Sequence, residues 1–168
     1  MHRQFAALHA ILSVARISAD VRERFMEMKE DFLDAHQRHW HDAELLFQMQ
    51  RWANADHLYG FAAECGLKAL MEELRIRPQG KDGRGHIMEP KTADSIWSKY
   101  QTCLSGQMCA TKFLLPNTNP FDDWLASQRY VNQAGFDEAR VQNHRDGARV
   151  ICDLLKKLER EGVGNYDF

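Results

Sequence analysis

Residues 42–70 decide the fold of this 168-residue chain, with DAELL at 42–46 followed by RWANADHLYGFAAECGLKAL at 51–70. Apolar and small residues recur in both segments at steps of three and four, the spacing that gathers side chains on one face of an α-helix. Asn54 is a favourable N-cap residue, so we expect one helix to end near Met49 and the next to run from about Asn54 to Arg75. The stretch therefore predicts a helical hairpin.

Two features predict how this hairpin packs. Towards Met49, one buried stripe is expected, made of Phe32, Ala35, His39, Ala43, Leu46 and Met49; in the second helix, one buried side is expected, made of Leu58, Ala62, Cys65 and Ala69. Gly60, Ala63 and Gly66 add small surfaces to that second helix. Since a helical glycine costs about 0.5–1 kcal/mol relative to alanine, we expect these glycines to allow close contact with another helix.

The rest of the chain shows the same helical period. Further helices are expected over about 3–16, from about 19–21 to 49, from 92 or 94 to 104, over 121–130, and over 137–161 with glycines at 162 and 164 ending the last. Proline occurs only at 78, 90, 116 and 120, and no run of alternating β-branched residues is long enough for a strand. The predicted fold class is all-α.

Composition narrows the class of protein. The chain is 44% hydrophobic and 27% charged, and its 22 Lys and Arg against 24 Asp and Glu give a formal net charge of −2, which is typical of a soluble globular protein and not of a strongly basic nucleic-acid-binding domain. The longest apolar run, 5–15, is about half of the ~20 residues that span a membrane. Four cysteines without CxxC spacing argue against a disulfide scaffold or zinc ribbon. We expect one cytoplasmic domain over 1–168, with no metal or other cofactor.

The quoted stretch resembles the HEPN superfamily, helical bundles in which a DAxxLL helix precedes a helix of the form A…AAE…LKAL. The resemblance covers about 34–160 and is clearest at 42–71. It implies an up-and-down bundle of four to five main helices with short extra helices, an N-terminal helical extension over 1–22, and a homodimer. Family members include ribonuclease toxins, often encoded beside a nucleotidyltransferase antitoxin, ribonuclease modules of defence systems, and noncatalytic nucleotide- or RNA-binding proteins.

The resemblance also implies a chemistry. Its ribonucleases carry an Arg and a His on a late helix, with four to six residues between them, that meet their copies across a homodimer and cleave RNA without metal. Arg can hold the scissile phosphate while His moves a proton and the 2′-hydroxyl attacks. Arg140 and His144 are the catalytic candidates; only three residues separate them, one short of the family pattern, yet an i, i+4 pair still shares one helix face. The alternative for this pair is surface ion pairs with Asp137, Glu138 or Asp146.

A rival catalytic pair lies in the early hairpin. Five residues separate Arg51 from His57, which fits the family spacing, and Tyr59 follows His57 as in toxins whose Tyr receives adenylyl groups from the antitoxin. The position at the start of an early helix does not fit the family pattern. The alternative is that His57 and Tyr59 pack or cap this helix.

Three other groups of residues have candidate roles. The glycine-rich loop before Pro90 carries a local excess of positive charge. It is predicted to bind substrate phosphates through Arg77, Lys81, Arg84 and His86. The alternative is a solvated loop without a binding role. Glu64 and Lys68 are spaced for a helical ion pair, and an inward-pointing Glu64 would need a cation such as Arg129. A cluster of histidines at 36, 39 and 41 is interpreted as polar helix surface, because position 41 turns away from the other two and no cysteine completes a zinc set.

The function predicted from these residues is an RNA-acting HEPN protein of a prokaryotic toxin–antitoxin or defence system, as a metal-independent endoribonuclease. The alternative is a noncatalytic module of the same fold that binds nucleotide or RNA or assembles with protein. The expected partners are a second copy of the chain, RNA or nucleotide, and a nucleotidyltransferase-type antitoxin, with no membrane.

Overall fold

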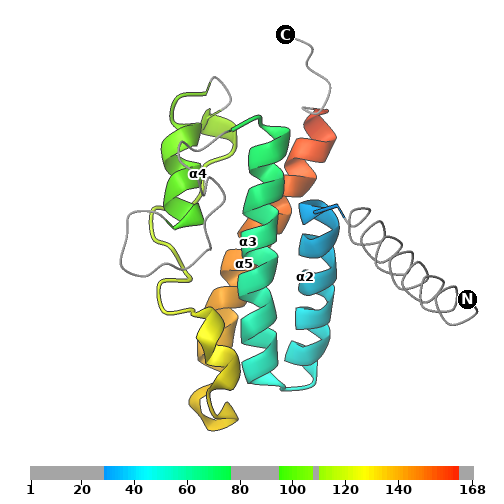
Figure 1. The fold of residues 1–168 in the computed structure, drawn as a ribbon, viewed down its shortest axis with the longest axis vertical. Coiled ribbons are helices and arrows are strands. Elements are labelled where there is room, and N and C mark those ends of the chain that lie inside the picture. Colours follow the sequence, from blue (N-terminus) through cyan, green and yellow to red (C-terminus); the bar gives the residue numbers. More distant parts are fainter. Residues whose placement is uncertain (1–28, 77–94, 108–109, 163–168) are drawn as a thin grey trace, which may run out of the picture. The chain divides into compact units, whose positions relative to one another are not determined.

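The computed structural model describes residues 29–76, 95–107 and 110–162 (Figure 1). The chain divides into two compact units, residues 1–31 and 32–168, and the elements described belong to the second. They are α2 (Phe32–Gln48), α3 (Trp52–Glu73), α4 (Ile96–Leu104) and α5 (Glu138–Glu161), with the short 3-10 helices η1 (Ala110–Lys112), η2 (Ala126–Tyr130) and η3 (Gln133–Gly135). Because the described part of the chain holds helices and no strand, the all-α class is confirmed. The helix expected over 3–16 lies outside the described residues.

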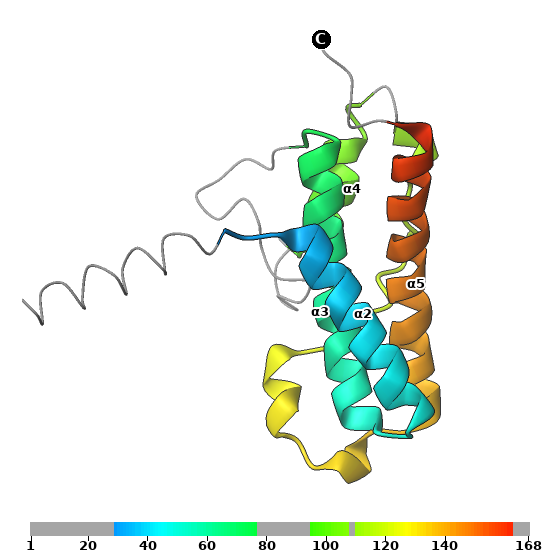
Figure 2. The ribbon, with the colours of Figure 1, turned by 90° about the vertical axis from the view of Figure 1, so that its right-hand side faces the viewer.

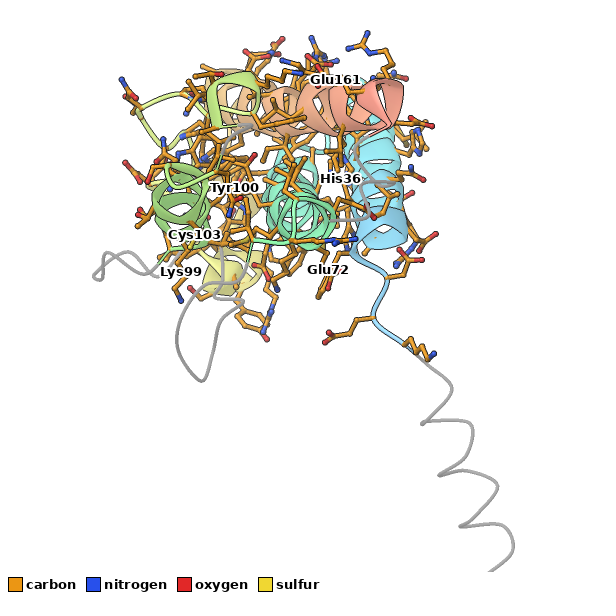
Figure 3. All side chains as sticks on the ribbon, turned by 90° about the horizontal axis from the view of Figure 1, so that it is seen from above. His36, Glu72, Lys99, Tyr100, Cys103 and Glu161 are labelled. Atoms are coloured by element: carbon orange, nitrogen blue, oxygen red, sulfur yellow. The ribbon has the colours of Figure 1, made fainter. Side chains whose placement is uncertain are left out.

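Helix α3 is the centre of the bundle. It packs against α2, α4 and α5, and the view from above shows it between α2 and α4, with α5 passing alongside (Figure 3). Its buried residues therefore lie on several sides, where the sequence predicted one: Ala62 and Ala69 are buried as expected, whereas Leu58 and Cys65 are only half-buried. None of the helices in the described ranges is long and apolar enough to cross a membrane.

The buried face of α2 is wider than the predicted stripe: Ala43 is buried and Phe32 and Leu46 pack against the core as expected, and further residues join them. His36 and Ala43 are the buried residues of this helix, and Met49, after its end, is 68% exposed. Two aromatic side chains of α2 face α3: the ring centroids of Trp40 and Phe47 lie 5.6 and 6.3 Å from that of Tyr59. The covered face of α2 therefore includes positions 36, 40 and 47 beside the predicted positions 32, 43 and 46.

The hairpin between α2 and α3 is tighter than predicted. α3 begins at Trp52, and the residue before it, Arg51, makes no side-chain capping bond; Asn54, the expected N-cap, lies inside the helix. Gln50 takes the left-handed conformation with φ 58°, and the Arg51 amide donates to the Leu46 carbonyl at 2.8 Å. Trp52 packs edge-on against Phe47 with centroids 5.0 Å apart. An aromatic contact across the turn, not a cap, accompanies the start of this helix.

The two glycines of α3 are where other groups approach its backbone. A Cβ on Gly66 would lie 2.6 Å from Nδ1 of His36 on α2 and 2.5 Å from Cγ2 of Ile151 on α5, so this glycine allows the close helix contact that was predicted. A Cβ on Gly60 would meet the indole of Trp124 at 2.1 Å. That second contact is with a turn, not with a helix.

Helix α5 matches its predicted bounds closely. Asp137 caps its N-terminus by accepting a hydrogen bond from the Arg140 amide at 2.9 Å, and Gly162, with φ 63°, ends it in the left-handed conformation. The helix expected over 121–130 is wrong in its first half, because only η2 is helical there. Phe121 and Trp124 are both buried, and the Trp124 amide donates to the Phe121 carbonyl at 3.0 Å, so a turn replaces the first helical turn. Figures 1 and 2 show the segment through η2 and η3, in yellow, at the end of the bundle where α3 and α5 begin.

Candidate functional site

Arg140 and His144 lie one turn apart near the start of α5, and two carboxylates meet them there. Asp56, from the second turn of α3, places Oδ1 2.6 Å from Nδ1 of His144. Asp123, from the turn between Phe121 and Trp124, places Oδ1 2.9 Å from Nε2 of the same ring. We call these four residues the Arg140–His144 site.

The imidazole of His144 is enclosed. Its side chain is 0% exposed, and its ring stacks on Phe121 with centroids 5.2 Å apart and 14° between planes. A carboxylate oxygen faces each ring nitrogen, and an ionised carboxylate only accepts hydrogen bonds, so two ionised carboxylates require N–H at both positions. The doubly protonated ring is then an imidazolium. With both carboxylates ionised, the imidazolium and Arg140 supply two positive charges against the two negative charges of Asp56 and Asp123.

Arg140, like His144, contacts the turn that carries Asp123. One terminal guanidinium nitrogen donates to Oδ2 of Asp123, and the other donates to the backbone carbonyl of Asp123 at 2.9 Å. Nε of Arg140 lies 3.9 Å from Oδ1 of Asp56, and the guanidinium carbon lies 5.6 Å from the centre of the Phe136 ring. Partial burial alone would raise the pKa of Asp123, but the hydrogen bond from His144 and the charges of His144 and Arg140 outweigh it and lower this pKa. Asp123 is therefore held as a carboxylate.

Asp56 is the inner anchor of the site. Its side chain is 1% exposed, and its Oδ2 is buried without a hydrogen-bond partner. Its backbone carbonyl accepts a hydrogen bond from Nε1 of Trp124 at 3.0 Å, which joins the start of α3 to the turn that carries Asp123. Because a buried carboxylate is costly without a cation, Asp56 and His144 hold each other in place.

Exposure rises across the site in one direction. Asp56 and His144 are buried, the Arg140 side chain is 25% exposed, and the Asp123 side chain is 57% exposed. Nδ1 of His144 thus faces the interior, and Nε2 faces the more exposed side, next to the guanidinium. A buried carboxylate that orients a histidine, with an arginine beside the outer ring nitrogen, is an arrangement suited to anion binding and proton transfer.

The rival residues are not brought together. Arg51 is exposed and stands just before α3 with a non-helical backbone, φ −87° and ψ 62°, whereas His57 is half-buried in the second turn of that helix. His57 stacks on Trp124 with centroids 5.5 Å apart, and burial together with the nearby charge of Arg129 lowers its pKa. Tyr59 is fully buried and its hydroxyl donates to Glu44 at 2.7 Å. It offers no accessible hydroxyl for modification in this structure.

A second polar cluster, which the sequence did not predict, joins three helices. Nε and a terminal nitrogen of Arg145 on α5 donate to the two carboxylate oxygens of Glu44 on α2, both at 2.7 Å, and Tyr59 of α3 donates to the same carboxylate. These hydrogen bonds lower the pKa of Glu44, and burial and the adjacent carboxylate raise that of Tyr59. Arg145 also lies 4.5 Å from the centre of the Phe47 ring. The cluster fixes the three helices to one another.

The predicted surface histidines have different environments. His36 is buried, and its Nδ1 lies 2.7 Å from the Ala62 carbonyl, which can only accept, so Nδ1 donates. Its Nε2 then accepts from the thiol of Cys152 at 3.3 Å. Burial lowers the pKa of His36 and raises that of Cys152 to about 12, in agreement with a neutral pair. His39 is half-buried and His41 is exposed, and within the described ranges no three potential ligands gather as a metal site would require.

The remaining candidates are distributed as follows. Nζ of Lys68 donates to Glu64 at 2.7 Å and lies 5.3 Å from the centre of the Phe32 ring. The guanidinium of Arg129, the other cation considered for Glu64, lies 4.7 Å from the centre of the Tyr130 ring. The predicted phosphate-binding residues lie outside the described residues: Arg77, Lys81, Arg84 and His86.

Sequence reasoning missed both carboxylates of the site. Asp56 lies within the stretch that decides the fold, in phase with Tyr59, Ala63 and Leu67 on a side of α3 that is buried. A lone charged residue on an apolar helix face was the signal that could have found it. The sequence places Asp123 only in the short helix expected over 121–130. It is exposed, and nothing in its own neighbourhood points to α5.

The chain matches no protein-family model, no curated protein and no solved structure.

Proposed function

We propose that this protein acts on RNA as a metal-independent endoribonuclease, with Arg140 and His144 as its catalytic pair. Arg140 would hold the scissile phosphate and neutralise the charge that develops on it. His144 would move a proton at Nε2, while Asp56 holds the ring through Nδ1. The resemblance of residues 34–160 to HEPN proteins supports RNA as the substrate and a prokaryotic toxin or defence role.

One observation carries this proposal. The inner nitrogen of His144 is held by a buried carboxylate at 2.6 Å, and its outer nitrogen faces an exposed acceptor that Arg140 also binds. Here two cations from one helix face converge on a single exposed anion, which is the arrangement that binding of a phosphate requires.

A specific observation favours a second function. Because His144 has no exposed surface and both its nitrogens are bonded, the same geometry suits a noncatalytic module in which the pair only binds nucleotide or RNA, or only joins α5 to α3. This alternative predicts saturable RNA binding without turnover. It also predicts that Arg140→Ala weakens binding and lowers its dependence on salt.

The experiment that separates these functions is cleavage of total RNA and of a short labelled RNA by the purified full chain in EDTA. We expect Arg140→Ala and His144→Asn each to lower the cleavage rate by about 10²–10⁴-fold, the usual contribution of a positioned acid, base or charge. Arg149→Ala and His41→Asn are the matched controls, since each removes the same residue type from an exposed position. Circular dichroism and urea unfolding would establish that each variant folds.

The outcomes are distinct. Cleavage that depends on Arg140 and His144 but not on the controls supports the ribonuclease. Cleavage that all four variants retain would refute this catalytic assignment. RNA binding without cleavage by the wild-type chain would favour the noncatalytic module.

We further propose that the protein works as a homodimer and is neutralised by a nucleotidyltransferase-type antitoxin, as the family resemblance implies. Tyr130 and Val131, 78% and 53% exposed, are large apolar side chains on the segment that borders the site, and they support an interface there. Light scattering would show a mass of two chains, and Tyr130→Ser with Val131→Ser would reduce it. A monomeric mass for the wild-type chain at all concentrations would refute the dimer.

A further inference from the structure

We infer that the carboxylate of Asp123 occupies the position of a phosphate in an anion-binding site made by Arg140 and His144, so that the chain blocks this site with its own side chain. The ligand class is a phosphodiester or another singly charged oxyanion. The identification of that ligand as RNA rests on the proposed function; the presence of an anion site does not.

The first support is how the two oxygens of Asp123 are shared. Oδ1 accepts from Nε2 of His144 at 2.9 Å, and Oδ2 accepts from the guanidinium of Arg140. A carboxylate and a phosphodiester each present two acceptor oxygens on one central atom and share one negative charge between them. Two donors that bind one oxygen each can therefore accept either group.

The second support is charge. With Asp123 in place, two positive and two negative groups balance. When its carboxylate turns away, Arg140 and His144 remain opposite Asp56 alone, and a net charge of about +1 stays in a partly buried position. A ligand with one negative charge restores neutrality. This condition fits the phosphodiester of a nucleic-acid backbone.

The third support is that the side chain of Asp123 can leave without its backbone. Phe121 and Trp124, on either side of it in the turn, are 0% and 1% exposed. The Asp123 carbonyl accepts hydrogen bonds from Arg140 at 2.9 Å and from Nε2 of Gln128 at 2.7 Å. Rotation about χ1 is then enough to free the site, and the 57% exposed side chain would be solvated by water after it turns.

Binding of inorganic phosphate tests this inference, measured by isothermal titration calorimetry on the full chain at low salt. We expect Asp123→Ala to bind phosphate about tenfold or more tightly than wild type, the change that follows loss of one charge-assisted internal competitor. Asp122→Ala is the matched control, because it removes the same charge from the adjacent exposed position. Asp123→Asn keeps the shape of the side chain without its charge, and we expect it to bind phosphate with intermediate affinity.

A double variant identifies the location of the bound phosphate. Asp123→Ala combined with Arg140→Ala should lose the gained affinity, whereas Asp123→Ala combined with Arg149→Ala should keep it. Equal phosphate affinity in wild type, Asp123→Ala and Asp122→Ala would overturn the inference. A gain that survives loss of Arg140 would overturn it as well, since the phosphate would then be bound elsewhere.

The same variants separate this inference from the proposed function. If Asp123→Ala binds phosphate through Arg140 but no variant cleaves RNA, the anion site stands and the ribonuclease fails. If wild type cleaves RNA through His144 while Asp123→Ala neither gains phosphate affinity nor cleaves faster, the ribonuclease stands and the internal block fails. We expect Asp123→Ala both to bind phosphate and to cleave faster than wild type.

Discussion

Asp56 is a buried carboxylate that is not fully hydrogen-bonded, a combination that is rare in folded proteins. Its carboxylate is buried, and one of its oxygens has no hydrogen-bond partner. Its other oxygen binds His144, so the negative charge is compensated through that ring and through Arg140 at 3.9 Å. The contribution of Asp56 to the stability of the fold therefore depends on the charge of its side chain and not only on its shape.

Asp56→Asn tests that dependence. The amide keeps an oxygen for Nδ1 of His144 but removes the charge, so we expect the free energy of unfolding to fall by about 1–3 kcal/mol. Urea unfolding at pH 7 measures it, and Asp122→Asn, at an exposed position, should change it by less than about 0.5 kcal/mol. Equal stability of the two variants would show that the charge of Asp56 is not needed.

Glu44 gives a prediction about pH. Its hydrogen bonds to Arg145 lower its pKa in the fold, while an unfolded glutamate titrates near about 4.3. The stabilisation is therefore fully present above about pH 4.3 and is lost as the pH falls through the lower folded pKa. We expect Glu44→Gln to unfold more easily at pH 7, by on the order of 1 kcal/mol, and to lose less stability than wild type between pH 5 and pH 3. Parallel stability curves for the two proteins would contradict this.

Among the helices, the contact of α3 with α2 and α5 at Gly66 leads to the third prediction. Alanine favours a helix over glycine by about 1 kcal/mol, yet its Cβ would overlap His36 and Ile151. We expect Gly66→Ala to lower the free energy of unfolding by about 1–3 kcal/mol, since overpacking outweighs propensity. The control is Gly106→Ala, whose nearest contact would be 3.9 Å. A stabilised Gly66→Ala would show that the helices separate at little cost.

The sequence predicted some helix ends well and others poorly, for identifiable reasons. α5 has Asp137 and Gly162 at its ends, and both residues act locally, so its bounds could be predicted. The start of α3 could not be predicted. Asn54 is a residue type that favours the N-cap position, whereas the helix begins at Trp52, whose contact with Phe47 lies across a turn. A cap is encoded within four residues, whereas an aromatic contact depends on the path of the chain.

The candidate site was predictable in part for a similar reason. Arg140 and His144 share one helix face, so their spacing alone placed them together. Their carboxylate partners could not be assigned, since Asp56 is 88 residues from His144 along the chain and Asp123 is 21. A single sequence carries little information on such pairs. The polar cluster of Glu44 and Arg145, separated by 101 residues, was missed for the same reason.

For the whole molecule, Cys152 offers a measure of how often the bundle opens. Its thiol lies against His36 between α5 and α2, and burial raises its pKa to about 12. We expect iodoacetamide at pH 8 to modify half-buried Cys103 first and Cys152 only in molecules that unfold. Peptide mass mapping over time would measure both rates, and Gly66→Ala should speed modification of Cys152. Equal rates at the two thiols in the wild-type chain would show that this part of the bundle opens locally.

Occupation of the Arg140–His144 site by Asp123 also determines which anions can displace its carboxylate. A tethered carboxylate is present at its site at a fixed effective concentration, in the millimolar range or above for short connections, whatever the concentration of protein. A small free anion must exceed that value to displace it. A polymer whose neighbouring charges are already bound elsewhere on the protein presents its next phosphate at a comparable effective concentration. The tether would thus make the Arg140–His144 site selective for chain length, rejecting free phosphate and mononucleotides while admitting long polyanions.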